Sequence, residues 1–159
     1  MYHSEAATGR PQFSKEGELK YYSQYLDCPN EPLYPFGYGL SYTEFSYGPV
    51  ELSTNVLHEG EKIQASVKLK NTGSRRGTEV VQLYLQDLFG SSVRPQRELK
   101  DFQRITLEPG EEQIVTFTIE EPMLRFFTEN RIYESEPGRF RAFIGSSSAE
   151  NDYVEFTLQ

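Results

Sequence analysis

From about Val50 onward, apolar and polar residues alternate along the chain in short segments that end at turn-forming residues. Between Ile63 and Leu69, every second residue is apolar and its neighbours are polar, and the segment stops at an Asn-Thr-Gly turn. Successive side chains of a strand point to opposite faces, so this alternation buries one face and leaves the other in water. The pattern predicts an antiparallel β-sandwich or barrel.

About seven or eight such segments occur, which is the strand count of an immunoglobulin or fibronectin type III-like sandwich. The expected strands are residues 51–54, 62–71, 79–87, 99–102, 113–120, 132–135, 139–145 and 153–158. With one cysteine and no tryptophan, the chain lacks the disulfide and the core tryptophan of antibody domains. The all-β, fibronectin type III-like, antiparallel sandwich is therefore the expected fold, with strand 79–87 at the centre of a sheet.

The 159 residues suffice for one domain with a short appendage. Residues 1–32 form an irregular arm without a sustained period, apart from a short helix expected between residues 18 and 26. Residues 33–48 form a linker dense in aromatic residues and glycines, and residues 49–159 form the sandwich. Apolar side chains at this density are unfavourable in water, so some other surface should cover the linker.

The charge balance limits the partners. Sixteen basic and 24 acidic residues give a formal net charge of −8, which repels phosphate backbones and anionic lipid. We therefore expect neither a nucleic-acid partner nor a membrane partner. The first residues lack the pattern of a signal peptide, and no apolar run is long enough to span a bilayer.

Candidate catalytic and metal-binding residues are few. The two histidines, His3 and His58, have no second ligand at metal-binding spacing, so we expect no metal and no cofactor. The paired glutamates beside strand 113–120 are typical of a solvated face. Asp87, at the end of its strand, is expected to start a turn by accepting a backbone hydrogen bond, and a site residue at a loop mouth is the alternative.

The aromatic residues of the linker are the first candidate site, because flat rings either stack on sugar faces or anchor one domain against another. Glycines and Pro35 interrupt them, which favours a closely packed anchor over a flat sugar-binding platform. The candidate anchors are Tyr34, Phe36, Tyr38, Tyr42, Phe45 and Tyr47.

A second candidate is the polar loop beside the central strand, which carries Arg94, Arg97 and Lys100. These cations are expected to pair with Glu98, Asp101 or an acidic neighbouring domain. A nucleic-acid patch is the alternative, and the net negative charge argues against it.

Four motifs in order resemble the C-terminal region of glycoside hydrolase family 3, the bacterial periplasmic β-glucosidase type. They are NEPLYPFGYGLSYTEFSY, VKLKNTGSRRGTEVVQLYLQD, SVRPQRELKDFQRITLEPGE and SEPGRFRAFIGSSS. The resemblance covers nearly the whole chain. It implies that residues 1–32 are the tail of a preceding α/β sandwich domain, and that residues from about Val50 are a fibronectin type III-like domain.

The resemblance also implies a larger parent that hydrolyses terminal β-glucosides with retention, through a barrel domain and an α/β sandwich domain. The family's nucleophile lies in a Ser-Asp-Trp-like motif of the barrel, and its acid/base glutamate lies in the sandwich domain. Neither carries over, because this sequence has no Ser-Asp dipeptide and no tryptophan. The chain alone is therefore expected to be inactive, to brace the catalytic domains, and to be periplasmic or secreted, with any signal peptide upstream. The polar loop with Arg94, Arg97 and Lys100 is the candidate for a loop that reaches towards the active site of the parent.

Two other functions stay open at this point. The first is a carbohydrate-binding module that uses the aromatic linker, and the second is a free-standing immunoglobulin-like interaction module. If the chain is part of an enzyme, its exposed arm could also pair with a second copy when the natural partner surface is missing.

Overall fold

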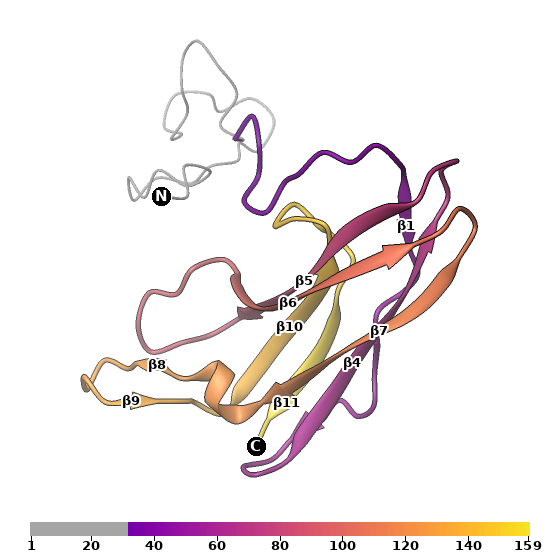
Figure 1. Ribbon diagram of the computed structural model, residues 1–159. Helices are drawn as coiled ribbons and strands as arrows, with labels where there is room; N and C mark the ends of the chain where they lie inside the picture. The colour runs from indigo at the N-terminus through magenta and orange to yellow at the C-terminus, as the bar shows by residue number, and fades with distance from the viewer. Residues whose placement is uncertain (1–31) are drawn as a thin grey trace, which may run out of the picture. The chain divides into compact units, whose positions relative to one another are not determined.

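The computed structural model describes residues 32–159, and the sandwich occupies Gly37–Gln159. Two sheets face each other and enclose a core between them (Figure 1). Several expectations concern residues outside the described range. They are the helix at residues 18–26, His3, the cysteine, and the arm 1–32 except for residue 32.

The first sheet is built around one long strand, β4 (Lys62–Asn71). Strand β7 (Glu112–Glu120) pairs with β4 in antiparallel register along almost its whole length. On the opposite edge of β4 lie two short strands, β1 (Phe45–Tyr47) and β2 (Glu51–Leu52). Strand β1 thus lies within residues 33–48, which the sequence assigned to the aromatic linker. These residues form a strand because their backbone pairs with the edge of β4.

The second sheet has the order β3-β11-β10-β5-β6. Its strands are β3 (Val56–Leu57), β5 (Gly77–Asp87), β6 (Glu98–Leu107), β10 (Gly138–Gly145) and β11 (Val154–Leu158). All neighbours are antiparallel except β3 and β11, which run parallel. The central position expected for the strand containing residues 79–87 is confirmed, since β5 lies between β10 and β6.

Between β7 and β10, the chain forms a helical turn and a small hairpin. The 3-10 turn η2 (Glu121–Leu124) is followed by β8 (Phe126–Phe127) and β9 (Tyr133–Glu134), which pair with each other. No helix among the described residues is long and apolar enough to cross a membrane.

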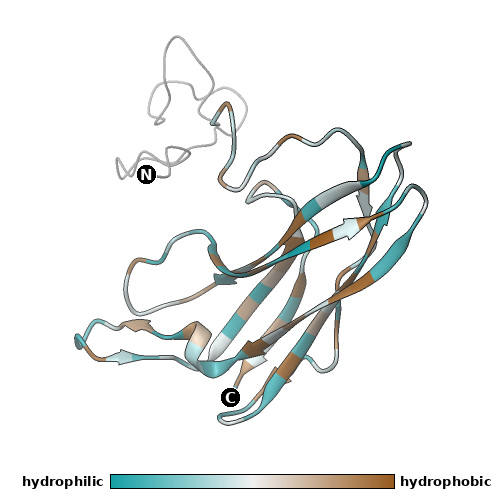
Figure 2. Ribbon diagram, in the orientation of Figure 1, coloured by the Kyte–Doolittle hydropathy of each residue, from teal (hydrophilic) through white to brown (hydrophobic). Residues whose placement is uncertain are grey.

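The core consists of the alternate residues that the sequence pattern assigned to it (Figure 2). Strands β4, β5, β7 and β10 each contribute one apolar row that points between the sheets, whereas β6 contributes Leu107 alone as a buried residue. The predicted rows that are buried include Ile63, Ala65, Val67 and Leu69, then Val81, Leu83 and Leu85, then Val115, Phe117 and Ile119, and finally Phe140, Ala142 and Ile144. Burying these rows on both sheets supplies the main favourable free energy of folding.

Candidate functional site

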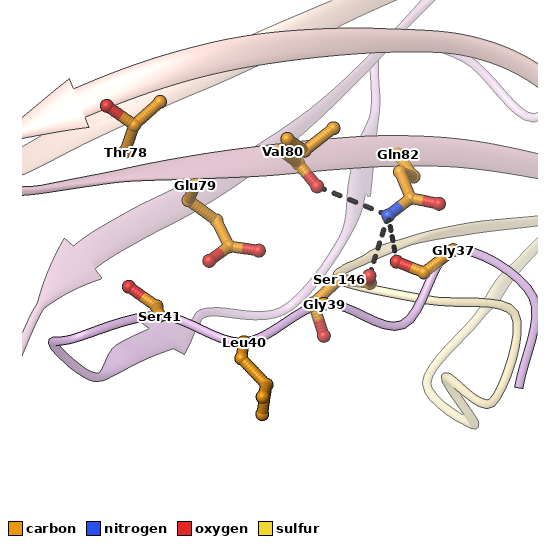
Figure 3. Close-up of a pocket in the computed structure, with 9 residues that line it drawn as sticks. All are labelled: Gly37, Gly39, Leu40, Ser41, Thr78, Glu79, Val80, Gln82 and Ser146. Atoms are coloured by element: carbon orange, nitrogen blue, oxygen red, sulfur yellow. Dashed lines mark hydrogen bonds between the residues drawn. The ribbon is translucent and has the colours of Figure 1, made fainter. Parts of the chain in front are cut away.

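Residues 81–85 of strand β5 are buried on both faces, and the reason lies in the segment that precedes β1. Its core row points between the sheets, whereas Gln82 and Tyr84 point to the outer face. Both are nevertheless buried, because residues 37–41 and the turn after β10 cover this part of the sheet (Figure 3). The outer face of β5 is therefore the place where the linker joins the sandwich.

Gln82 is the residue that ties these segments together. Its side-chain Nε2 donates hydrogen bonds to the backbone oxygen of Gly37 at 3.1 Å and to that of Ser146 at 2.6 Å. Its Oε1 accepts a hydrogen bond from the Tyr84 hydroxyl at 2.5 Å. One buried amide thus holds the linker, the β10–β11 turn and β5 in fixed positions, and we refer to this arrangement as the Gln82 clasp (Figure 3).

Gly37 is required by this arrangement for two independent reasons. Its φ is +81°, a left-handed conformation that favours glycine. A Cβ atom at this position would also collide with the side chains of Gln82 and Tyr84. A larger residue would therefore push the linker away from the sheet.

A small hollow of about 150 Å³ lies beside the clasp, between residues 37–41 of the linker and β5. The carboxylate in its wall is that of Glu79 (Figure 3). Glycoside hydrolysis needs two carboxyl groups on either side of the scissile bond. The hollow therefore does not provide the pair of groups that this chemistry requires.

Glu79 is paired with an aromatic residue of β1. The Tyr47 hydroxyl donates a hydrogen bond to Glu79 Oε1 at 3.1 Å. Burial raises the pKa of the Tyr47 phenol, and the nearby Glu79 carboxylate raises it further. Burial also raises the pKa of the Glu79 carboxyl above its ordinary 4.5, although hydrogen bonds from Tyr47 and the Val80 backbone oppose this shift.

We predict that Glu79→Gln stabilises the sandwich more at pH 7 than at pH 4. The Glu79 carboxyl keeps its proton to a higher pH in the folded protein than in the unfolded chain, because its pKa is raised above 4.5 by folding. Ionised Glu79 therefore lowers the free energy of unfolding as the pH rises above 4.5 through the pKa of the folded state. Glutamine still accepts the Tyr47 hydrogen bond but does not ionise. Urea unfolding at both pH values measures the difference, with Glu61→Gln on an exposed turn as control. Equal effects at the two pH values would contradict the prediction.

The six candidate anchors fall into two groups. Tyr34, Phe36, Tyr38 and Tyr42 are exposed to solvent within this chain, Tyr42 almost completely at 95%. Phe45 and Tyr47 instead lie on β1 and pack against the core of their own sandwich. Strand pairing with β4 holds both residues on the sandwich, and both are half-buried.

The three candidate cations of the 88–97 loop and β6 are folded back onto the sandwich. Arg94 stacks on the Phe126 ring at 4.2 Å and pairs with Glu98 at 3.0 Å. Lys100 pairs with the same Glu98 at 2.6 Å, which confirms the pairing expected for this carboxylate.

Arg97 stacks on a ring of β10, that of Phe143, at 4.0 Å. Its Nη1 also donates a hydrogen bond to the backbone oxygen of Glu150. Burial lowers the pKa of its guanidinium. The cations thus hold the loop in place, and Phe89 and Val93 are among its exposed residues.

Asp87 has the turn-starting role expected from the sequence, since its Oδ1 accepts a hydrogen bond from the Phe89 backbone N–H at 3.1 Å. Within residues 32–159, no cluster of three or more histidine, cysteine, aspartate or glutamate side chains could hold a metal ion.

Two features of this region were not anticipated from the sequence. Gln82 has the pattern of an ordinary polar residue on a strand, and only Val80 and Tyr84, two residues before and after it on the same face, indicate in the sequence that this face is partly apolar. The β8–β9 hairpin was expected only as the segment 132–135, because its first strand is two residues long.

Comparison with known proteins identifies the domain. Residues 79–148 match the family of fibronectin type III-like domains. The chain is 46% identical over 158 residues to a periplasmic β-glucosidase of Salmonella typhimurium, covering 99% of this chain and 20% of that protein. It is 44% identical over 137 residues to the β-glucosidase BoGH3A of Bacteroides ovatus, covering 86% of this chain and 18% of that protein.

A solved structure is also similar to the chain. The β-glucosidase of Listeria innocua, crystallised with glucose, superposes with a TM-score of 0.87 and 41% identity, covering 99% of this chain and 22% of that one. The chain carries the fibronectin type III-like domain of glycoside hydrolase family 3 β-glucosidases. The expected fold and the resemblance to the C-terminal region of this family are thus confirmed.

This fibronectin type III-like domain and its linker span about a fifth of the length of the relatives they match. Within the Gln82 clasp, Gln82 and Ser146 lie inside the matched range 79–148, whereas Gly37 lies before this range. The clasp therefore joins the domain to the segment that leads into it.

Proposed function

We propose that this chain is the C-terminal accessory part of a larger β-glucosidase that hydrolyses terminal β-glucosides, and that it braces the catalytic domains. The observation that carries the proposal is the coverage: 99% of the chain matches the Salmonella typhimurium enzyme, but only 20% of that enzyme is matched. The sequence also lacks the Ser-Asp-Trp-like motif that the family's nucleophile requires.

The proposed partners are the barrel and α/β sandwich domains of the same polypeptide, and residues 1–32 are proposed to be the tail of the latter. The proposed contact is the exposed part of the linker, with Tyr34, Phe36, Tyr38 and Tyr42. Each aromatic ring that becomes buried there contributes at roughly 25 cal/mol per Å² of apolar surface removed from water. The periplasmic location of the Salmonella typhimurium relative supports a periplasmic or secreted location here.

We predict that Phe36→Ala combined with Tyr38→Ala in the parent enzyme lowers its Tm by at least about 2 °C, because two interdomain anchors are lost. Residual activity after heating should fall in parallel with the Tm. Differential scanning calorimetry and heat-inactivation assays measure the two quantities. Ile114→Ala is the matched control, since Ile114 is an exposed apolar residue on β7.

An unchanged Tm combined with weaker retention on a polysaccharide column would contradict the bracing role. That result would instead support the carbohydrate-binding module. A chain that is complete and active in solution without catalytic domains would support a free-standing interaction module.

A further inference from the structure

A second group of exposed apolar residues lies at the end of the sandwich where β5 passes into the 88–97 loop. The loop lies beside the β8–β9 hairpin at this end (Figure 1). The exposed apolar side chains of the two segments, which we call the end surface, have exposed fractions from 54% to 101%. They are Phe89, Val93, Phe127, Ile132 and Tyr133.

The loop and the hairpin are bound together by hydrogen bonds. The Ser92 hydroxyl donates to the backbone oxygen of Phe127 at 2.8 Å, and the Ser91 N–H donates to Glu136 Oε2 at 2.9 Å. In return, the Glu129 N–H donates to the Ser91 hydroxyl at 3.2 Å. The two segments therefore form one unit, although some 35 residues separate them in the sequence.

The base of this unit is also fixed. Gly90 lies so close to Arg94 and Phe126 that a Cβ atom there would meet both side chains at 3.0 Å and 3.3 Å. On the hairpin side, Arg125 and Ser135 both donate hydrogen bonds to the buried Glu121 carboxylate. The apolar side chains are thus presented on a backbone that is already ordered.

At the tip of the hairpin, Arg131 has a φ of 62°. This left-handed conformation costs a non-glycine residue roughly 1–2 kcal/mol. Hydrogen bonds between Thr128 and the backbone of Arg131 and Ile132 hold it in place. Strain of this kind is often found where a segment binds another molecule.

An ordered apolar surface of this kind is unusual on a monomer and typical of a contact with another surface. A second copy of the chain is an unfavourable occupant, because the net charge is −8 and the exposed Glu129 and Glu134 add negative charge beside the end surface. The other available occupant is the remainder of the polypeptide, since about four-fifths of the length of the matched relatives lies outside this chain.

We propose that the end surface is a second docking face for the catalytic part of the parent enzyme, separate from the aromatic linker. The proposal rests on the accessory function proposed above. The complementary surface should be an apolar depression with cationic groups at its rim, which face Glu129 and Glu134. With two contacts at separate places, the sandwich would be fixed in orientation as well as tethered.

Hydrogen exchange, read by mass spectrometry, tests this proposal in the intact parent enzyme and in the 159-residue chain. We expect backbone amides of residues 88–97 and 126–133 to exchange about tenfold more slowly in the enzyme. In the enzyme, Phe127→Ser with Tyr133→Ser should abolish this difference. The matched control, Phe102→Ser with Ile114→Ser, removes two equally exposed apolar residues from β6 and β7 and should leave it unchanged.

Equal exchange of both segments in the enzyme and in the chain overturns the docking face. If residues 37–44 are nevertheless slower in the enzyme, the accessory function stands while the docking face fails. If these residues also exchange equally, both proposals fail. If protection from exchange in the isolated chain increases with its concentration, the surface is assigned to contact with a second copy. Slow exchange that requires added glucan would assign it to carbohydrate.

Discussion

Replacing Phe156 with alanine is expected to lower the free energy of unfolding of the sandwich by about 3–5 kcal/mol. Phe156 lies on β11 with 1% of its surface exposed, and its ring stacks on that of Phe140 at a centroid distance of 5.5 Å. Alanine removes this contact and leaves a cavity between the two sheets. The surrounding strands cannot close the cavity, because hydrogen bonds hold β11 in register with β10.

Chemical unfolding of the 159-residue chain, followed by circular dichroism, measures this loss. The matched control is Phe102→Ala, because Phe102 is 57% exposed on β6. Its removal should change the free energy of unfolding by less than about 0.5 kcal/mol. Similar losses from both variants would show that the core does not lie between the sheets where the burial pattern places it.

The same substitution separates two roles of the domain in the parent enzyme. If the domain acts as a brace, Phe156→Ala should lower the temperature at which activity is lost, while kcat and KM at low temperature stay at wild-type values. A large change in KM at low temperature would instead mean that the sandwich contributes residues to the substrate site.

The strands that form the core were predictable from sequence because each buries one face. Alternation located β4, β5, β7, β10 and β11 to within about two residues at either end, which is the usual accuracy of such boundaries. Turn residues are also informative, because Gly110, directly after Pro109, has a left-handed φ of +78°.

Other elements leave little trace in the sequence. Strands β1, β3 and β8 have only two or three residues, too few to show a period. The expected strand 99–102 is part of the longer β6 (Glu98–Leu107). Residues 103–107 were not predicted as strand, because most of them are polar.

The candidate site shows the same limit. The exposed linker aromatics could be picked out by composition. The aromatic partners of Arg94 and Arg97, and the backbone oxygens that Gln82 binds in the linker and after β10, could not. They come from segments some 30 to 60 residues away that only the folded sheets bring together.

Asn71 is a further residue whose role depends on such distant contacts, and Asn71→Ala is expected to cost about 2–4 kcal/mol of unfolding free energy. In the sequence, Asn71 marks the end of a strand before a turn. In the structure, it is completely buried. Its Nδ2 donates hydrogen bonds to the backbone oxygens of Arg75 at 2.7 Å and Leu107 at 3.0 Å.

The other side-chain atom of Asn71 is equally engaged. Its Oδ1 accepts hydrogen bonds from the Thr43 hydroxyl at 2.8 Å and from the Gly73 N–H at 3.1 Å. Alanine would leave buried donors and acceptors without partners, and each of these costs about 1–3 kcal/mol unless water reaches it. Since Thr43 lies in the linker just before β1, the loss should also loosen the junction through which the linker enters the sandwich.

Asn71→Asp distinguishes hydrogen bonding from the simple loss of volume. Aspartate has almost the same size, but at pH 7 it cannot donate to the Arg75 and Leu107 carbonyls and would place a buried charge beside them. We therefore expect Asn71→Asp to destabilise the sandwich at least as much as Asn71→Ala in urea unfolding at pH 7. Asn151→Ala, at an exposed position, is the control. A wild-type stability for Asn71→Asp would mean that packing, and not the network of four hydrogen bonds, is what Asn71 contributes.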